Sequence, residues 1–480
     1  MAHRNEIARA DAIALDDGSR RWSEAELDEE VETLAARLST CQLRVLATLL
    51  DNSAAWVLAD LAAARAGLVH LPLPTFFTRD QQLHALAATG ADALLTLPGV
   101  APTLPSIVAR EAAVVAGTTL ELLLLQARAV PELPAGTSKI TFTSGSTGTP
   151  KGVCLSADAM FRVAEGVALA TDPLAIERHL CALPLAVLLE NVVGVLAPRL
   201  RGATSIVPPL ARLGLRGSSS FDAAIFDDAV AQYAPHSIVL LPQMLRAWTE
   251  HLEHRGRLAS AGLKLVAVGG AAVGSNWIRR ARARGIPVYE GYGLSEGASV
   301  QTLNLPGADR PGSAGRPLPH ARIRVNAGGE LEIAGPLMLG YLGNEVGTRS
   351  DWWPTGDVGA IDSEGFVHVH GRRSNILITA FGRNVSPEWV ETVLKGESAI
   401  AEAIVFGEGR AALRAVLWPS SAEVDDCELD AAVQAANRKL PDYARIAGWT
   451  RAIVEFGSAG TTTPNGRPLR GAIEKLHAED

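Results

Sequence analysis

Cysteine is scarce in this chain, and long apolar runs and net positive charge are lacking. No cysteine pair has C-x-x-C spacing, so neither a disulfide framework nor a zinc site is expected, and the expected location is a reducing cytoplasm. No apolar run approaches the roughly 20 residues that cross a bilayer, so no membrane span is expected. The N-terminal sequence MAHRNEIARADAIALDDG carries charges where a secretory signal needs an apolar core. The formal net charge of −8 argues against a protein that binds nucleic acids non-specifically. The four cysteines are Cys41, Cys154, Cys181 and Cys427.

The length and the hydrophobic pattern predict a layered α/β protein of at least two domains. A chain of 480 residues is long for one compact core. In the first part, short apolar runs alternate with helical patterns, which is typical of parallel strands joined by crossover helices. The predicted strands are Arg44–Leu50, Leu68–Leu71, Asp92–Leu97, Ser237–Leu241, Leu263–Val268 and Pro287–Glu290, with a helix over Ala54–Ala66.

The pattern changes after about residue 318. Two hairpin patterns, over residues 322–334 and around Asp362–Gly365, predict a β-rich lobe at the end of the first domain. Residues 374–480 read as a small α+β unit, so the predicted domains are residues 1–373 and 374–480. The strands predicted in the second domain are Ala403–Phe406, Leu413–Trp418 and Ala452–Phe456, with a helix near Asp430–Lys439.

The most informative segment is a glycine- and hydroxyl-rich loop that follows the apolar run around Ile140. Over residues 141–152 it reads TFTSGSTGTPKG, with three glycines whose backbone N–H groups can approach an anion and six hydroxyls that add donors. Lys151 adds a compact positive charge for phosphate. A Walker loop needs adjacent Gly-Lys, which Thr149-Pro150 interrupts, so this is not a standard P-loop. Composition alone leaves a flexible surface loop as an equal alternative.

The run TSGSTGTPKGV is similar to the signature loop of the adenylate-forming superfamily, which includes acyl- and aryl-CoA synthetases and firefly luciferase. The resemblance extends over most of the chain through later motifs in the expected order. It implies a large N-terminal α/β domain, a small mobile C-terminal domain and a nucleotide site between them. The loop would hold the β- and γ-phosphates of ATP. The loop residues concerned are Thr143, Ser144, Gly145, Ser146, Thr147, Gly148 and Lys151.

Two further segments resemble the nucleotide-binding motifs of that superfamily. Gly270 and Ala271 would lie beside the adenine ring. In YEGYGLSE, Tyr292 would stack on adenine, with Gly293 beside it, and Ser295 would approach the α-phosphate. Glu296 would hold Mg²⁺, because a carboxylate beside a triphosphate is repelled unless a hard cation lies between them.

The segment WWPTGD and the Gly-Arg pair that follows it would bind the ribose. Asp357 would accept hydrogen bonds from both ribose hydroxyls, since a carboxylate can accept two donors in a fork. Arg372 would also reach the ribose.

The same glycine-rich segment admits one different interpretation. Residues 293–297 read GLSEG and satisfy G-x-S-x-G, the nucleophile elbow of α/β-hydrolases. That hypothesis leaves the phosphate loop unexplained.

The second domain carries two departures from the family pattern. Ser374 takes the hinge position, which usually holds Asp or Lys. Arg467 takes the position of the lysine that bridges the substrate carboxylate and the α-phosphate. A guanidinium keeps the charge but is planar and forked, and we expect it to stabilise the in-line transition state. Arg383, in the motif that lines the thiol route, could contact phosphate.

The segment LPLAVLLEN over residues 183–191 resembles the acyl-pocket segment of the family, with Val187 in place of the usual histidine. It contains no aspartate to pair with the ammonium of an amino acid, so it favours an aliphatic or aromatic acid. Glu190 is expected to be either a solvent-facing or capped carboxylate or a wall residue of the nucleotide or acyl channel.

The resemblance predicts an ATP- and Mg²⁺-dependent acid–thiol ligase. It would activate a carboxylic acid, expected to be a fatty or other apolar acid, as its AMP ester with release of pyrophosphate. It would then transfer the acyl group to a thiol, with CoA expected as the acceptor. Two alternatives stay open: a ligase that loads the phosphopantetheine of an acyl carrier protein, and a degenerate protein that binds adenylates without catalysis.

Overall fold

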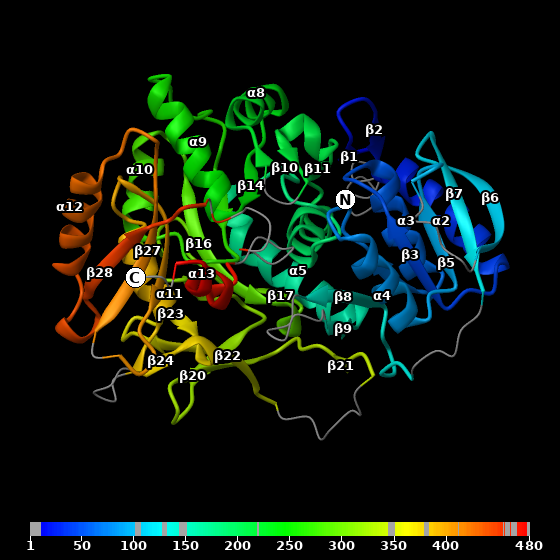
Figure 1. The fold of residues 1–480 in the computed structure, drawn as a ribbon. Coiled ribbons are helices and arrows are strands. Elements are labelled where there is room, and N and C mark those ends of the chain that lie inside the picture. Colours follow the sequence, from blue (N-terminus) through cyan, green and yellow to red (C-terminus); the bar gives the residue numbers. More distant parts are fainter. Residues whose placement is uncertain are drawn as a thin grey trace.

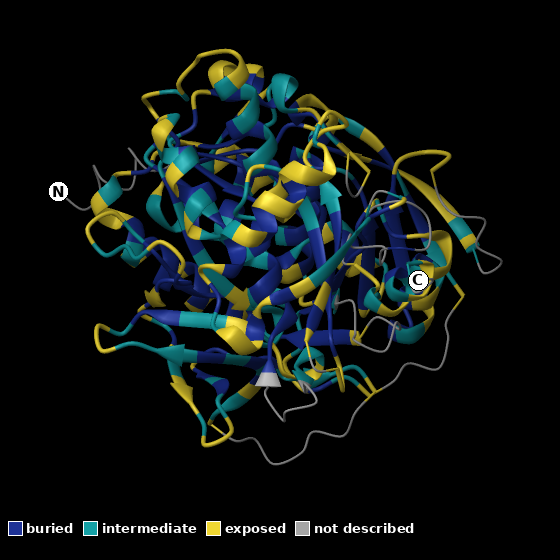
Figure 2. Ribbon diagram, turned by 60° about the vertical axis from the view of Figure 1, so that its left-hand side comes forward, coloured by how far each residue is buried: buried dark blue, intermediate teal, exposed yellow. Residues whose placement is uncertain are grey.

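Two large sheets form the centre of the N-terminal part of the molecule. The computed structural model describes residues 11–100, 107–126, 132–143, 151–217, 220–343, 351–378, 384–410, 412–454, 456, 461 and 468–477. Figure 1 shows the chain running from the N-terminal strands at one end to the C-terminal unit at the other. Figure 2 shows that the strands of the interior are buried, whereas the exposed residues gather on outer helices and turns.

The first sheet has nine strands, and its central strands are parallel. The pairs β1–β11, β10–β11, β10–β14, β14–β15 and β15–β16 are parallel, and the strands at both edges are antiparallel. In order across the sheet, the strands are β18 (Arg316–Pro317), β17 (Ser299–Leu303), β16 (Val288–Leu294), β15 (Leu265–Val268), β14 (Ser237–Leu240), β10 (Arg178–Leu180), β11 (Thr204–Ile206), β1 (Ile13–Asp16) and β2 (Arg21–Ser23).

The second sheet has eight strands, and it also combines a parallel centre with antiparallel edges. β8, β4, β3 and β5 are parallel neighbours, and every residue of β3 is buried because helices cover a parallel sheet on both faces. In order across the sheet, the strands are β21 (Gly340–Tyr341), β9 (Lys151–Leu155), β8 (Lys139–Thr143), β4 (Val69–Pro72), β3 (Val45–Leu49), β5 (Ala93–Thr96), β7 (Thr118–Leu125) and β6 (Ile107–Val115).

The helices of this part follow from capping residues and apolar faces. In α2 (Glu24–Thr40), Ser23 and Glu26 form a capping box, and Leu27, Val31 and Leu34 recur at helical spacing on the buried side. The other helices among the described residues of this part are α3 (Ala54–Arg65), α4 (Arg79–Thr89), α5 (Ala157–Thr171), α6 (Leu188–Glu190), the π-helical turn η2 (Asn191–Leu196), α7 (Ala197–Arg201), α8 (Ala223–Tyr233), α9 (Pro242–His254) and α10 (Ser275–Ala283). The described residues of this part also form the short turns η1 (Asp172–Leu174), η3 (Leu210–Leu213) and η4 (Ser295–Gly297) and the small hairpin of β12 (Leu215–Arg216) and β13 (Ser220–Phe221). Among the described residues, no helix is long and apolar enough to span a membrane.

A four-stranded antiparallel sheet forms the β-rich lobe that the hairpin patterns predicted. Its strands in order are β19 (Arg322–Val325), β20 (Glu330–Ala334), β22 (Trp353–Ile361) and β23 (Val367–Arg372). The lobe brings β22 and β23 together in the register Asp357↔Arg372.

The C-terminal domain is a small α+β unit with its own apolar core. Its elements are η5 (Arg373–Asn375), β24 (Leu377–Ile378), β25 (Asn384–Val385), α11 (Pro387–Leu394), β26 (Ile400–Phe406), β27 (Leu413–Pro419), α12 (Asp426–Asn437), η6 (Asp442–Ala444), β28 (Ile446–Arg451) and α13 (Arg470–Leu476). β26, β27 and β28 form one sheet, on which α11 and α12 pack. The predicted strand over Ala452–Phe456 is wrong: the strand lies at Ile446–Arg451, parallel to β27. The predicted helix near Asp430–Lys439 begins earlier, at Asp426, because Asp425 and Glu428 form a capping box.

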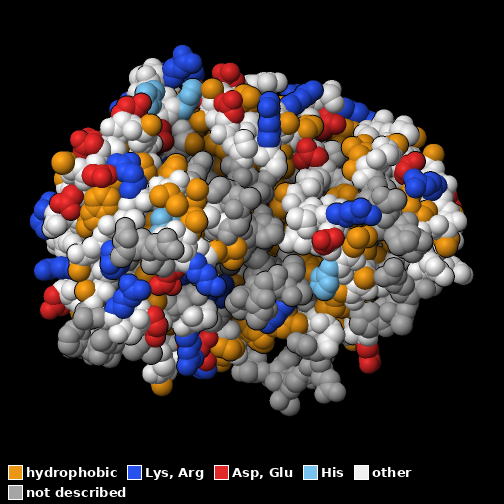
Figure 3. All heavy atoms as spheres, in the orientation of Figure 1, with side chains coloured by type: hydrophobic (Ala, Val, Ile, Leu, Met, Phe, Trp, Pro, Cys, Tyr) orange, Lys and Arg blue, Asp and Glu red, His pale blue; other side chains and the backbone are white. Residues whose placement is uncertain are grey.

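The surface carries mixed charge. On the face drawn in Figure 3, lysine and arginine side chains are interspersed with aspartate and glutamate side chains, and they do not form one basic patch.

Candidate active site

The hairpin of β8 and β9 brackets the predicted phosphate loop. The two strands pair in the register Thr143↔Lys151, so the loop leaves one strand where the other begins. Residues 144–150 and the side chain of Thr143 lie outside the described part of the chain, which leaves the predicted contacts of Ser144, Gly145, Ser146, Thr147 and Gly148 untested. Lys151 is exposed, and its Nζ lies 5.6 Å from the centroid of the Tyr341 ring.

A buried network of charged and polar side chains holds the start of β8, the strand that leads into this loop. Lys139 Nζ lies 2.7 Å from Asp60 Oδ1, and His70 Nδ1 lies 2.6 Å from the same oxygen. Asn191 donates to Asp60 Oδ2 at 2.8 Å. Burial alone would raise the pKa of Asp60, but the charge of Lys139 and the hydrogen bond from His70 hold it below its usual value.

β16 and the turn after it carry Tyr292, Gly293, Ser295 and Glu296. β16 ends at Leu294, and Ser295 to Gly297 form the short 3-10 turn η4, after which β17 returns antiparallel to β16. A nucleophile elbow needs a turn from a strand into an α-helix, so this context contradicts the hydrolase hypothesis. A Cβ on Gly293 would lie 2.3 Å from the carbonyl oxygen of Ser299, which explains why glycine stands at this position.

Glu296 contacts Tyr341, which sequence reasoning did not identify. The Tyr341 hydroxyl donates to Glu296 Oε1 at 2.7 Å, although the two residues are 45 positions apart. Burial and then the charge of Glu296 raise the pKa of Tyr341 well above its ordinary value. The phenol therefore stays protonated and orients a half-buried carboxylate.

Asp357 is buried and lies between a phenol and a guanidinium. The Tyr292 hydroxyl donates to Asp357 Oδ2 at 2.6 Å, and Arg372 Nε lies 3.0 Å from Asp357 Oδ1. Arg372 also donates to the carbonyl oxygen of Thr355 at 2.9 Å, which fixes the direction of the guanidinium. Burial and the charge of Asp357 raise the pKa of Tyr292 well above its ordinary value.

These two carboxylate groups share one neighbourhood. The charge of Arg372 acts on the Tyr341 phenol, and the Tyr341 ring meets the Trp353 ring edge to face at 6.2 Å, at the start of β22. Lys151 on β9, Glu296 on the turn after β16 and the pair of Asp357 and Arg372 therefore converge, although they come from three different sheets.

Glu290 is a second residue that sequence reasoning missed. It lies on β16 close to the predicted adenine segment: its Oε1 accepts from the backbone N–H of Val273 at 3.0 Å, two residues after Ala271. Glu290 Oε2 has no hydrogen-bond partner, and burial raises the pKa of the carboxyl to about 7. Gly270 and Ala271 are exposed beside it. The signal in the sequence was a carboxylate inside an otherwise uncharged strand.

The residues of the predicted acyl segment, Glu190 included, are mostly buried. Leu183, Leu185 and Leu188 are buried in three hydrophobic clusters, whereas Val187 is half-buried. Glu190 is not solvent-facing: the side chain is fully buried, and its Oε1 lies 3.1 Å from His179 Nε2, which makes it a capped carboxylate. Its alternative role as a wall residue of the nucleotide or acyl channel stays a prediction.

Polar contacts hold the chain on both sides of the predicted hinge, one within the β-rich lobe and one within the C-terminal domain. Arg373 pairs with Glu330 at 2.9 Å, and Asn375 donates to Glu388 at 2.6 Å. Ser374, at the predicted hinge, is exposed between them. Arg383 and Arg467 lie outside the described residues, so their predicted contacts stay predictions.

Comparisons with known proteins cover nearly the whole chain. A family model described as "AMP-binding enzyme" matches residues 3–342, and a second, "AMP-binding enzyme C-terminal domain", matches residues 374–480. A feruloyl-CoA synthase of Amycolatopsis sp is 30% identical over 97% of this chain and 96% of its own length. A long-chain-fatty-acid–CoA ligase of Mycobacterium bovis is 25% identical over 88% of this chain and 85% of its own length. In structure, the chain is similar to the o-succinylbenzoate CoA synthetase of Bacillus subtilis solved with its acyl-adenylate intermediate, with a TM-score of 0.76, 24% identity, and coverage of 97% of this chain and 96% of the other.

Proposed function

The chain belongs to the family of AMP-binding enzymes, and from that premise we propose that it converts an apolar organic acid, by way of its acyl-adenylate, into a thioester of coenzyme A. It is an acid–thiol ligase that uses ATP, Mg²⁺ and CoA, as the resemblance predicted.

The observation that carries the proposal is the convergence of two carboxylates, each held by a phenol, with two cations beside them. We assign the ribose hydroxyls to Asp357 and Arg372, the adenine ring to Tyr292 with Gly270, Ala271 and Gly293, and the α-phosphate to Ser295. The β- and γ-phosphates fall to Lys151 and residues 143–148.

Glu296 fits a magnesium ion. Its carboxylate is half-buried and oriented by Tyr341, and carboxylate oxygens are donors that Mg²⁺ prefers. The ion would neutralise phosphate charge when bound.

Two displacements make up the reaction. The carboxylate oxygen of the acid attacks the α-phosphorus in line, and pyrophosphate leaves with the electrons of the broken P–O bond. The thiolate then attacks the acyl carbonyl carbon, and AMP leaves. Arg467 is assigned to the charge that develops at the α-phosphate, and Arg383 to a phosphate contact.

The acid is proposed to be uncharged beyond its carboxylate, with an aliphatic or aromatic body. Val187 and Leu189 are half-buried on the acyl segment, while Glu190 is bonded to His179 and does not supply a charge for a substrate ammonium. Burying an unpaired ammonium would cost several kcal/mol, about 3–5 by analogy with broken buried ion pairs.

Residues 374–480 are proposed to move as a unit about a pivot at Ser374. They have their own core, formed between Val385 and Ile446. Their contacts with the first domain include hydrogen bonds from Trp277 to the Lys395 carbonyl oxygen at 2.9 Å and from Asn276 to the Gly396 carbonyl oxygen. The reaction is assigned to the cytoplasm, since all four cysteines are free thiols.

The test is ATP- and acid-dependent hydroxamate formation with a panel of fatty, cinnamic, benzoic and amino acids, followed by thioester formation with CoA or a phosphopantetheinylated carrier protein. Amino acids should be poor substrates, and CoA should be the better acceptor. Acceptance of the carrier protein alone would replace CoA in the proposal. Thioester formation only from a preformed acyl-adenylate would indicate the degenerate alternative.

Asp357→Asn tests the assigned nucleotide site. Losing charge-assisted hydrogen bonds to the ribose should raise the KM for ATP about 10- to 100-fold. The matched control is Glu332→Gln, which removes a carboxylate paired with Arg324 on the same sheet, at 2.7 Å, and should leave the KM for ATP unchanged. Equal KM values in wild type and Asp357→Asn would refute the ribose assignment.

A further inference from the structure

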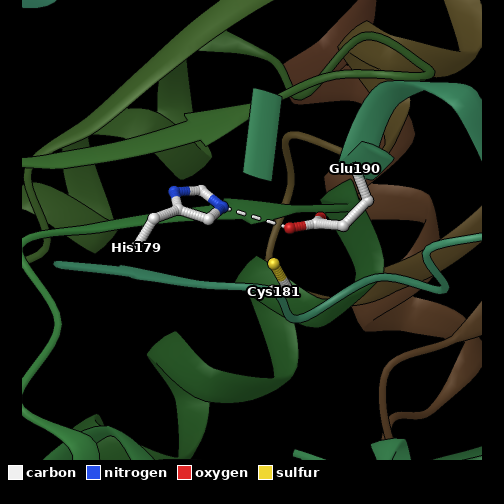
Figure 4. A group of neighbouring side chains, drawn as sticks. All are labelled: His179, Cys181 and Glu190. Atoms are coloured by element: carbon white, nitrogen blue, oxygen red, sulfur yellow. Dashed lines mark hydrogen bonds and ion pairs between the residues drawn. The ribbon is translucent and has the colours of Figure 1, made fainter. Parts of the chain in front are cut away.

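Three side chains that bind metals in other proteins meet in the interior, away from the nucleotide residues. β10 carries His179, and Cys181 follows two residues later on the same face of the extended chain, whose backbone still bonds to Ile206. Glu190, at the end of α6, points toward them, as Figure 4 shows. One ligand atom from each residue lies within 4.8 Å of the others, and His179 Nε2 and Glu190 Oε1 are 3.1 Å apart. Their exposed fractions are 3%, 0% and 0%.

The helix beside this trio leaves space for it. Gly194 lies in η2, the π-helical turn directly after Glu190, and a Cβ there would lie 2.6 Å from Glu190 Oε1 and 2.8 Å from Cys181 Sγ. π-helical turns are rare in proteins, and those that occur often lie at functional sites. The carbonyl oxygen of Gly194 lies 3.4 Å from Cys181 Sγ, so this oxygen is close enough to serve as a fourth ligand.

The histidine ring is held in the orientation that a ligand needs. His179 Nδ1 lies 2.8 Å from Ser237 Oγ on β14. With the Nδ1 proton donated to that hydroxyl, the lone pair of Nε2 faces Glu190 and Cys181. An outer hydrogen bond that fixes the tautomer is the usual accompaniment of a metal-binding histidine.

The carboxylate is left incompletely satisfied by protein groups. Glu190 Oε2 is buried and has no hydrogen-bond partner. Buried carboxylates are normally paired or coordinate a cation, because an unpaired charge in the interior is costly. This carboxylate therefore has an oxygen without a protein partner, while its other oxygen lies beside an imidazole and a thiol.

We propose that His179, Cys181 and Glu190 bind a divalent transition-metal cation of the zinc type. Imidazole, thiolate and carboxylate are the ligands that Zn²⁺ takes. One thiolate and one carboxylate supply two negative charges, which cancel the charge of the ion, so the occupied site is neutral overall and suits the interior. Binding displaces the thiol proton to solvent.

The ion would act as a structural clamp. It would join β10 of the nine-stranded sheet to the end of α6, and residues 182–189, which include most of the acyl segment, run between those two points. Burial of all three side chains closes the site, which is typical of structural and not catalytic zinc. The cysteine spacing led us to expect no zinc site, because it contains no C-x-x-C pair and because H-x-C on a strand carries no separate signal for the third ligand.

The experiment measures metal on the full chain, expressed in zinc-supplemented medium and purified without a polyhistidine tag. Mass spectrometry of the dialysed protein should find about one zinc per chain. Cys181→Ser and Glu190→Gln should lose it. Cys154→Ser is the matched control, since Cys154 is another fully buried cysteine, on β9 of the other sheet, and this variant should keep the metal.

A cobalt readout identifies the sulfur ligand and does not require a Cys181 variant that folds. Protein grown with Co²⁺ should show a thiolate-to-cobalt charge-transfer band in the near ultraviolet. A chain with Cys41, Cys154 and Cys427 all changed to serine should retain that band, because Cys181 is then the sole thiol. Metal-free wild-type protein, metal retained in Cys181→Ser, or absence of the band from the chain with Cys181 alone would each overturn the proposal.

Discussion

Burial of the Glu290 carboxyl should make the fold less stable as the pH rises from 5 to 8, and Glu290→Gln should remove that contribution. The side chain is 7% exposed, with one oxygen bonded to the Val273 N–H and the other without a partner. Glutamine has nearly the same shape and stands in for the protonated acid. Its carbonyl oxygen can keep the bond to Val273.

The magnitude follows from the two pKa values. Burial raises the pKa of Glu290 from 4.5 to about 7 in the folded chain. Between these values the unfolded chain has lost the proton that the folded chain retains, so the free energy of unfolding falls as the pH rises through this window. The full effect is about 3 kcal/mol, of which about 2.5 kcal/mol falls between pH 5 and pH 8.

Urea unfolding followed by tryptophan fluorescence at pH 5 and pH 8 measures the effect. Glu290→Gln should gain about 2.5 kcal/mol relative to wild type on going from pH 5 to pH 8. Glu29→Gln, which removes an exposed carboxylate on α2, is the control for the change in net charge. If wild type and Glu290→Gln lose stability in parallel as the pH rises, the carboxyl does not titrate near pH 7 and the reasoning is wrong.

Two further substitutions test contacts near the site. Asp60→Asn should destabilise the fold by about 3–5 kcal/mol, because it leaves the Lys139 ammonium buried without a counter-charge. Lys139→Met in the Asp60→Asn background should recover much of that loss in urea unfolding, whereas strictly additive losses would exclude the pairing. Tyr341→Phe removes the hydrogen bond that orients Glu296 and should raise the Mg²⁺ concentration for half-maximal activity roughly tenfold. An unchanged Mg²⁺ dependence would show that Glu296 does not need this phenol.

Most of the central strands could be predicted from the sequence because they are buried on both faces. Strands such as Val45–Leu49 and Leu265–Val268 are almost continuous apolar runs, and the observed strands lie within the predicted segments. The strand Ile446–Arg451 could not be placed from the sequence, because it lies at a sheet edge and is largely half-exposed. The apolar residues just after it gave the stronger strand pattern. The β6–β7 hairpin was missed because its turn uses Ala116 and Gly117, both with positive φ, in place of a recognisable Asn-Gly.

Site residues, like strands, could be predicted only where the local sequence carries a pattern. Residues such as Tyr292, Glu296 and Asp357 could be proposed from the sequence because their neighbours define a motif, and their roles stay predictions. The partner Tyr341 has no such neighbours, and its role depends on the pairing of β21 with β9, which places it beside Lys151. Contacts between elements far apart in sequence leave no local pattern, so only the fold could reveal this pairing.

A buried ion pair holds β8, the strand that leads into residues 144–150, in place. β8 pairs with β4 through His70↔Lys139, and the ammonium of Lys139 meets both Asp60 of α3 and Asn191 at the start of η2. A shift of β8 along its axis would separate a buried ion pair in a medium of low dielectric constant, which costs more than sliding apolar contacts. The same asparagine begins the helical turn that follows the acyl segment. One buried carboxylate, that of Asp60, therefore contacts both the strand before the phosphate loop and the end of the acyl segment. A substitution of Asp60 should shift both segments.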